Sequence, residues 1–253
     1  MDKATGYSKP PVREALIDIR IDPLPFSKIE LLERLQDQLG PNYSIKKKQQ
    51  RWSGIFQWQE EAVATKTSHG ITGLQFENAG GTRVIQFQLD GFVCNFIKPD
   101  DTAPWEGWTA LRDEAQRAWN LYAKALGITE TAGFSVRYIN QIVIPTAPIE
   151  LTDYLTVPPE VPKGFPYQDL HGWLSRVNVV VHDLNAIAII TQAPAEEPTT
   201  PDSAKILLDI DIVRRIKAPL DSDAMWAMLD RFRDIKNNLF ETSLTDKAKE
   251  LFR

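Results

Sequence analysis

Acidic, arginine and amide side chains that alternate with aliphatic residues on predicted strands have the most capacity for chemistry in this sequence. Asp209 and Asp211 fall on the side of one strand that its aliphatic residues leave free, because successive side chains point to opposite faces. In the strand predicted from Phe134 to Pro145, Arg137 and Gln141 share one face. An arginine fork bound by carboxylates is rigid and directional, so this set could hold a polar ligand or a protein partner.

The first predicted strand adds Asp18 and Arg20 to this set. If the strands lie in one sheet with these side chains on the same face, the acids and the two arginines meet in a single groove. The acids are Asp18, Asp209 and Asp211. The alternative is that they form the solvated face of an antiparallel sheet, which alternates in the same way. We predict that the binding residues of the groove are Arg20, Arg137, Gln141, Asp209 and Asp211.

Motifs of known catalytic chemistry do not occur in the sequence. It holds no nucleophile elbow, no glycine-rich phosphate loop and no zinc-binding pattern, and Cys94 has no base near it in the sequence. A hydrolase built on Asp209 and Asp211 would need a metal or a raised carboxyl pKa, for which the sequence gives no sign. We therefore predict no catalytic residue, no metal and no cofactor. The three histidines show no ligand spacing: His69, His171 and His182.

Tryptophan is the other notable residue type, with seven in the chain. Trp52, Trp58 and Trp105 lie near predicted element edges, where an aromatic side chain can anchor an interface. Packing in the core is the alternative for all three. A homodimer could also form through an edge strand such as 52–59.

The predicted elements that position these residues begin with a strand at 14–22 and a helix at Ser27, where Ser27 and Glu30 match a capping box. Antiparallel strands follow, with Gln86 and Gln88 alternating on one of them. The N-A-G-G at 78–81 favours a hairpin turn. A long helix is predicted over 104–126 and ends at a glycine.

The second half begins with the strand at 134–145 and a short helix near 149–155. A proline-rich loop at 157–166 leads to three strands, at 173–181, 186–192 and 205–216. The final long helix is predicted from 221 or 222 to about 240, and a last helical turn or two over 245–252 closes the chain.

Both halves therefore read strand, helix, three strands, long helix. The spacing of Trp108, Leu111, Leu121, Tyr122 and Leu126 recurs at Trp226, Leu229, Leu239, Phe240 and Leu244. Internal repeats decide a fold when they occur. We predict an internally duplicated α+β protein whose antiparallel sheet is covered by long helices on one face. Its two repeats, 1–130 and 131–253, would pack as one pseudo-twofold unit.

Composition narrows the class of protein. Hydrophobic residues make up 43% of the 253 residues, which is enough for a sizeable core. The formal net charge of −5 argues against nucleic acid and anionic membranes as partners. One cysteine, no signal peptide and no long apolar run indicate a cytoplasmic protein.

Several segments in order match a known pattern: P-P-V-R-E-A at 10–15, R-Y-I-N-Q-I at 137–142, and K-N-N-L-F-E-T-S-L-T-D-K at 236–247. They resemble a sporadically distributed family of uncharacterised bacterial proteins of about 250 residues. The resemblance covers nearly the whole chain and brings no reaction, cofactor or catalytic residue with it. Its patchy occurrence is typical of defence, toxin-partner or immunity genes.

We therefore expect a non-enzymatic cytoplasmic binding protein that recognises a macromolecular partner, such as a toxin or a defence component. The alternative is a small-ligand-binding or hydrolytic domain with a polar groove between its two halves. Replacement of Arg137 and Asp209 separates the two hypotheses, because only the second requires both side chains for activity.

Overall fold

A nine-stranded antiparallel sheet forms the body of this mixed α+β protein. The computed structural model describes residues 7–59, 62–100, 102–145, 149–195 and 203–253, with backbone alone at 45, 51–59 and 62–69. The strands are β1 (Val12–Arg20), β2 (Ile45–Gln59), β3 (Ala62–Glu77), β4 (Arg83–Gln88), β5 (Gly91–Ile97), β6 (Glu130–Thr131), β7 (Gly133–Ile144), β8 (Ser175–Val181), β9 (Ala186–Pro194), β10 (Ala204–Arg214) and β11 (Ala218–Pro219).

The sheet order is β2-β3-β4-β5-β1-β7-β10-β9-β8, so the strands that open the two halves of the chain, β1 and β7, pair at its centre. Their register places Leu16 opposite Arg137 and Asp18 opposite Ser135. On the other side of β7, Asp211 of β10 lies opposite Arg137. β6 and β11 form a separate two-stranded ladder.

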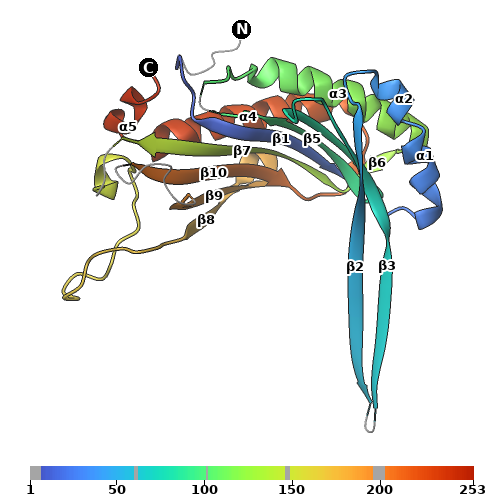
Figure 1. Cartoon of the computed structure of the whole chain (residues 1–253), viewed down its shortest axis with the longest axis horizontal. Helices are drawn as coiled ribbons and strands as arrows, with labels where there is room; N and C mark the ends of the chain where they lie inside the picture. Colours follow the sequence, from blue (N-terminus) through green and yellow to red (C-terminus); the bar gives the residue numbers. More distant parts are fainter. Residues whose placement is uncertain (1–6, 60–61, 101, 146–148, 196–202) are drawn as a thin grey trace.

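The helices are α1 (Ile29–Glu33), α2 (Gln36–Leu39), α3 (Gly107–Leu126), α4 (Ser222–Ser243) and α5 (Asp246–Glu250). In Figure 1 both long helices, α3 and α4, run along the upper side of the sheet, and the β2–β3 hairpin extends below it. No described helix is long and apolar enough to cross a membrane.

Aromatic side chains fill the space between the long helices and the sheet. Trp119 and Tyr122 of α3 pack against Phe92 of β5, and Phe232 of α4 packs against Phe134 of β7. All but Phe134 are less than 2% exposed. Burying side chains of this size supplies much of the hydrophobic stabilisation of the fold.

The chain entering the first helix differs from the predicted capping box. Pro25 is extended and precedes a 3-10 turn, η1 (Phe26–Lys28), so Ser27 lies inside that turn and caps nothing. The helix is also split into α1 and α2. The prediction was wrong because the proline sets the start of the turn two residues before the serine, and a capping side chain must lie outside the helix.

Other boundaries agree more closely with the sequence. Gly127 ends α3 with a φ of 68°, and Asp221 caps α4 by accepting a hydrogen bond from the Ala224 amide. The Asn78 side chain closes the predicted hairpin turn by accepting from the Thr82 and Arg83 amides. The short helix expected near 149–155 is a single 3-10 turn, η2 (Leu151–Asp153).

Charged side chains join α3 to α4. The Trp108 indole donates a 2.7 Å hydrogen bond to Asp230, and Arg112 Nε lies 3.1 Å from the same carboxylate. The Arg112 guanidinium also lies over the ring of Trp226, 5.7 Å from its centroid. Asp230 therefore satisfies the buried indole N–H and orients the arginine that covers the second tryptophan.

Asp230→Ala should destabilise the protein by about 2 kcal/mol, because the buried Trp108 N–H loses its acceptor and Arg112 loses the nearer of its two carboxylates. Urea unfolding of the two proteins measures this difference. Asp234→Ala is the matched control, since its carboxylate is two-thirds exposed and should matter by less than about 0.5 kcal/mol. Equal effects of the two substitutions would contradict a special role for Asp230.

Candidate binding face

The side of the central strands that points away from α3 and α4 carries the predicted groove residues. We call this surface the polar face and define it by Asp18, Arg20, Gln88, Arg137, Asp209 and Asp211. Their neighbours along each strand, among them Ile17, Ile19 and Ile210, point into the core and are fully buried. The predicted alternation is therefore confirmed for these strands.

Arg20 and Asp18 form one of two charged pairs on the polar face. Arg20 Nε lies 2.7 Å from Asp18 Oδ1, and Nη2 donates to Oδ2 at 2.8 Å. The remaining Nη1 donates to Gln88 of β4 at 2.9 Å and lies 3.6 Å from Asp90. The guanidinium is thus held on several sides while its side chain stays 41% exposed.

Arg137 and Asp209 form the second pair, across β7 and β10. Arg137 Nε donates to Asp209 Oδ1 at 2.9 Å, and Nη2 donates to Oδ2 at 2.5 Å. Such a two-bond fork fixes both groups in one plane. The Asp209 side chain is only 11% exposed, whereas Arg137 remains 42% exposed and so accessible to a partner.

Asp211 lies in a position that disfavours its ionised form. Burial is the largest cause that raises its pKa to about 6, and the nearby Asp209 and Asp18 carboxylates raise it further. Arg137 opposes this shift by favouring the ionised form. Burial also raises the pKa of Asp18, against the lowering effect of Arg20. The face therefore contains a carboxyl that changes charge near neutral pH, for which the sequence gave no sign.

Amide side chains extend the polar face across β2, β3 and β4. Gln49 donates to Gln86 at 2.6 Å, Gln88 donates to the same oxygen at 3.0 Å, and Gln75 donates to Glu77 at 2.7 Å. These bonds hold the side chains in fixed positions, so the surface is organised before any partner arrives.

The sequence predicts part of this amide row. The alternation of Gln86 and Gln88 indicates their strand, but the prediction does not include Gln49 and Gln75. The alternation of Gln75 with the buried Leu74 and Phe76 was a signal that could have identified it.

The remaining predicted site residues are distributed differently. Gln141 lies farther along β7 and accepts a 2.8 Å hydrogen bond from Arg13, so it does not join either charged pair. Trp105 is partly buried and packs against Tyr138 at 6.1 Å between ring centroids. The side chains of Trp52 and Trp58, on β2, lie outside the described residues.

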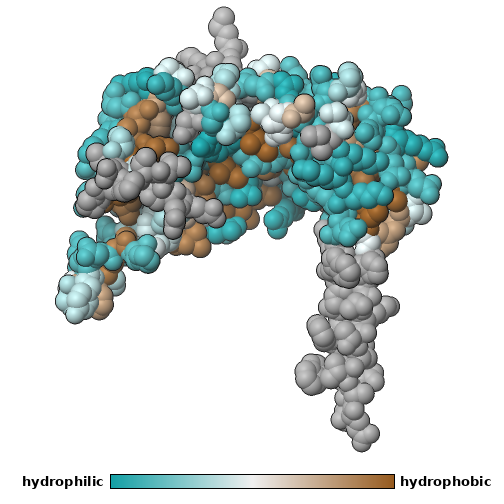
Figure 2. All heavy atoms as spheres, viewed as in Figure 1, coloured by the Kyte–Doolittle hydropathy of each residue, from teal (hydrophilic) through white to brown (hydrophobic). Residues whose placement is uncertain are grey.

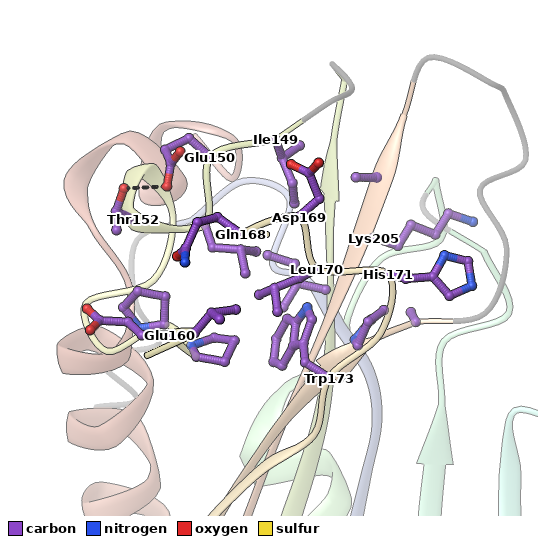
Figure 3. A pocket seen from close by; sticks show the side chains of 18 of the residues that line it. Ile149, Glu150, Thr152, Glu160, Gln168, Asp169, Leu170, His171, Trp173 and Lys205 are labelled. Atoms are coloured by element: carbon purple, nitrogen blue, oxygen red, sulfur yellow. Dashed lines mark hydrogen bonds between the residues drawn. The ribbon is translucent and has the colours of Figure 1, made fainter. Parts of the chain in front are cut away.

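A separate cleft of about 810 Å³ lies where β9 ends, near Pro194, and β10 begins, near Ala204. Figure 3 shows Trp173 and Leu170 within it and Asp169, His171 and Lys205 toward its rim. None of the polar-face residues lines this cleft. Within the described ranges, no group of three or more histidine, cysteine or acidic side chains could hold a metal ion.

Comparison with known proteins adds no identity to this geometry. No protein-family model matches the chain, and no curated protein matches it.

The unusual position of Asp211 predicts a pH-dependent stability. Its folded-state pKa lies above the ordinary value, so its contribution to stability is present at low pH and is lost as pH rises from about 4 through about 6. Asp211→Asn should therefore stabilise the protein by about 2 kcal/mol at pH 8 and hardly at all at pH 4. Urea unfolding at both pH values measures the difference.

Two variants make this result specific. Asp169→Asn, in an exposed loop, should change stability by less than about 0.5 kcal/mol at either pH. Asp209→Asn should destabilise at pH 8, because Arg137 loses its ionised partner. A destabilising effect of Asp211→Asn at pH 8 would show that its charge is needed.

Proposed function

We propose that this chain is a non-enzymatic protein that binds a macromolecular partner on its polar face. The observation that carries the proposal is the pair of half-exposed arginines, Arg20 and Arg137, each already fixed by a carboxylate. An arginine held in this way loses little conformational entropy when it meets a partner. Arginine is also enriched among the residues that dominate protein interfaces.

The charges of the face favour a protein partner over nucleic acid. Carboxylates flank both arginines, because Asp18 lies beside Arg20 on β1, and Asp209 and Asp211 of β10 lie beside Arg137. The surface is therefore mixed in sign and does not form the basic stripe that phosphates require. Figure 2 shows hydrophilic and hydrophobic residues side by side beneath the helices. A mixed surface of this kind is typical of non-obligate protein interfaces.

The outline of the molecule gives such a partner a defined place. In Figure 1 the β2–β3 hairpin descends from one end of the sheet, and the segment before β8 descends at the other. A partner under the sheet would lie between these two projections, in contact with the polar face.

We also propose that the fold arose by internal duplication, with the long helices of both repeats on one face of the sheet. The pairing of β1 with β7 at the sheet centre supports this, because each is the first strand of its half. The contacts between the long helices add support. Trp108 meets Asp230, and Trp226 meets Arg112, so each tryptophan contacts the residue four positions after its counterpart.

The partner class that we propose, a toxin or a defence component in the cytoplasm, rests on the family resemblance alone. The geometry supports the choice of the polar face as the binding surface, and the resemblance suggests the biological setting. A polar face that is fixed in advance suits tight and specific inhibition of one partner, because little reorganisation is needed on binding.

One observation favours the alternative, a small-ligand or hydrolytic site. Asp211, with a pKa near 6, could act as a general base near neutral pH, since the most effective catalytic pKa lies close to the working pH. Its Oδ1 atom is buried without a hydrogen-bond donor in the described structure. The cleft that contains Trp173 is not lined by Asp211, so a ligand bound there would not reach this carboxyl.

Arg20→Ala with Arg137→Ala should remove partner binding. The double variant should also be less stable, because Asp18 and Asp209 lose the cations beside them, so circular dichroism first checks that it is folded. Native mass spectrometry of tagged protein purified from its own host measures the co-purified mass. Arg231→Ala is the matched control, since this arginine pairs with Asp183 away from the polar face. It should retain the partner.

Other outcomes discriminate among the hypotheses. A co-purified mass of a few hundred daltons that is lost with Asp211→Asn would favour the small-ligand alternative. A folded double arginine variant that retains a macromolecular partner in the normal ratio would exclude the polar face as the binding surface.

A further inference from the structure

Exposed hydrophobic side chains are concentrated at the end of the molecule that carries β8. Of the eleven large hydrophobic residues that are exposed in the described chain, nine lie between Val157 and Ile187. They include Phe165, Tyr167 and Leu174, which are 54% to 75% exposed. Figure 2 shows hydrophobic residues at the lower left, where this segment leaves the body. Scattered exposed hydrophobics are normal, but a cluster of this kind marks an interaction site.

Within the described residues, the strand β8 has one open edge. It is last in the sheet order, and β9 is the strand paired with it in the part of the chain that the structure describes. Val177 and Val179 point to the helix side of the sheet, and Val180 points to the other side, yet all three are 43% to 57% exposed. Edge strands normally carry charges or prolines that prevent pairing. Here Arg176 is the single charge on the strand.

The sequence of β8 is suited to pairing with itself. Its centre reads V-N-V, so two antiparallel copies centred on Asn178 place Val177 opposite Val179 of the partner and the two asparagines opposite each other. In the same register Arg176 faces Val180 of the other copy rather than a second arginine. Aliphatic pairs and amide pairs across strands stabilise a sheet, whereas like charges in that position destabilise it.

We propose that β8 is a self-association edge, at which two copies of this chain pair antiparallel and extend the sheet across a twofold axis. The occupant is a second copy because a strand edge requires another strand, and this strand complements itself. The nine exposed hydrophobic residues between Val157 and Ile187 would supply the apolar centre of such an interface. The proposal is independent of partner binding on the polar face.

The surroundings of β8 add to the buried area of such a dimer. Tyr167, Leu170 and Leu174 belong to the projecting segment before the strand, whereas Ile187 lies beside Val180 on the neighbouring β9. Pairing the two edges would bring the same residues of both copies to one interface. That symmetry is what a twofold dimer requires.

Sedimentation analysis and light scattering of the full chain test the proposal directly. The wild-type protein should have twice the 28.7 kDa mass of one chain at micromolar concentration. Val179→Lys should weaken the dimer by at least about 100-fold, because the twofold axis places two unpaired charges in the interface. Ile216→Lys is the matched control, because this residue is 40% exposed but lies outside the cluster, and it should leave the dimer intact.

A cross-link tests the register even if the lysine variant fails to fold. Asn178→Cys should form a disulfide-linked dimer under mild oxidation, because directly opposed strand residues lie within disulfide distance. The natural Cys94 is fully buried and should not compete. Thr152→Cys, exposed but outside the cluster, should stay monomeric on a non-reducing gel.

The proposal would be overturned by a wild-type protein that stays monomeric at high micromolar concentration, by a dimer that survives Val179→Lys unchanged, or by an Asn178→Cys variant that does not cross-link. A mass increase that corresponds to a different protein bound at this edge would also overturn it.

Discussion

The antiparallel pairing of β1 with β7 at the centre of the sheet is the constraint on which the other features depend. It joins the two halves of the chain and fixes which side chains face the helices and which face away. Because the side-chain period of a strand is two, a shift of one residue would bury Asp18 and expose Ile17. Both changes would raise the free energy of the folded protein. Burying the Asp18 charge in the core would cost far more than exposing Ile17. The core and the polar face therefore specify the same register.

The polar face owes its order to competition between burial and pairing. Carboxylates on a large sheet are partly removed from water, which raises their free energy unless cations stand close to them. Arg20 and Arg137 supply this compensation for Asp18 and Asp209. Asp211 receives less of it, and its pKa near 6 records the difference. A surface that keeps carboxyls such as Asp18 and Asp211 in positions that raise their pKa departs from what stability alone would select, which is common at functional sites.

The two edge strands of the sheet, β2 and β8, differ in what lies around them. At one end β2 continues into a long hairpin that leaves the body, and at the other β8 ends the sheet with aliphatic side chains exposed on both faces. The core between α4 and the sheet covers β7 and β10, where Phe134 packs on Phe232. On β8, Val181 packs against this core, whereas Val177, Val179 and Val180 stay exposed. A sheet wider than its helical layer leaves hydrophobic surface at the margin. A second chain is the simplest cover for that surface, whereas the polar face remains open to another partner.

Much of this protein was determined by sequence patterns that act over a few residues. Alternation identified the strands and the side of each that carries Asp209, Asp211 and Arg137, and a period of 3.6 residues identified the long helices and their buried tryptophans. These features can be predicted from the sequence because each acts on the backbone close to it. Gly127 ends α3 and Asp221 caps α4 through their immediate neighbours, and strand alternation follows from the geometry of successive residues. The capping box at Ser27 failed because Pro25, only two residues away, set the turn first.

Only the tertiary structure decided which strands are neighbours, and this order controls everything that depends on distance. It buried Asp211 and placed it near Asp18, which raised its pKa, and among the described strands it left β8 paired on one edge alone. Trp105 shows the same limit, since its packing on Tyr138 joins segments more than thirty residues apart. Electrostatic energy and burial depend on what lies within a few ångströms, and a linear sequence with many possible strand orders does not specify those neighbours.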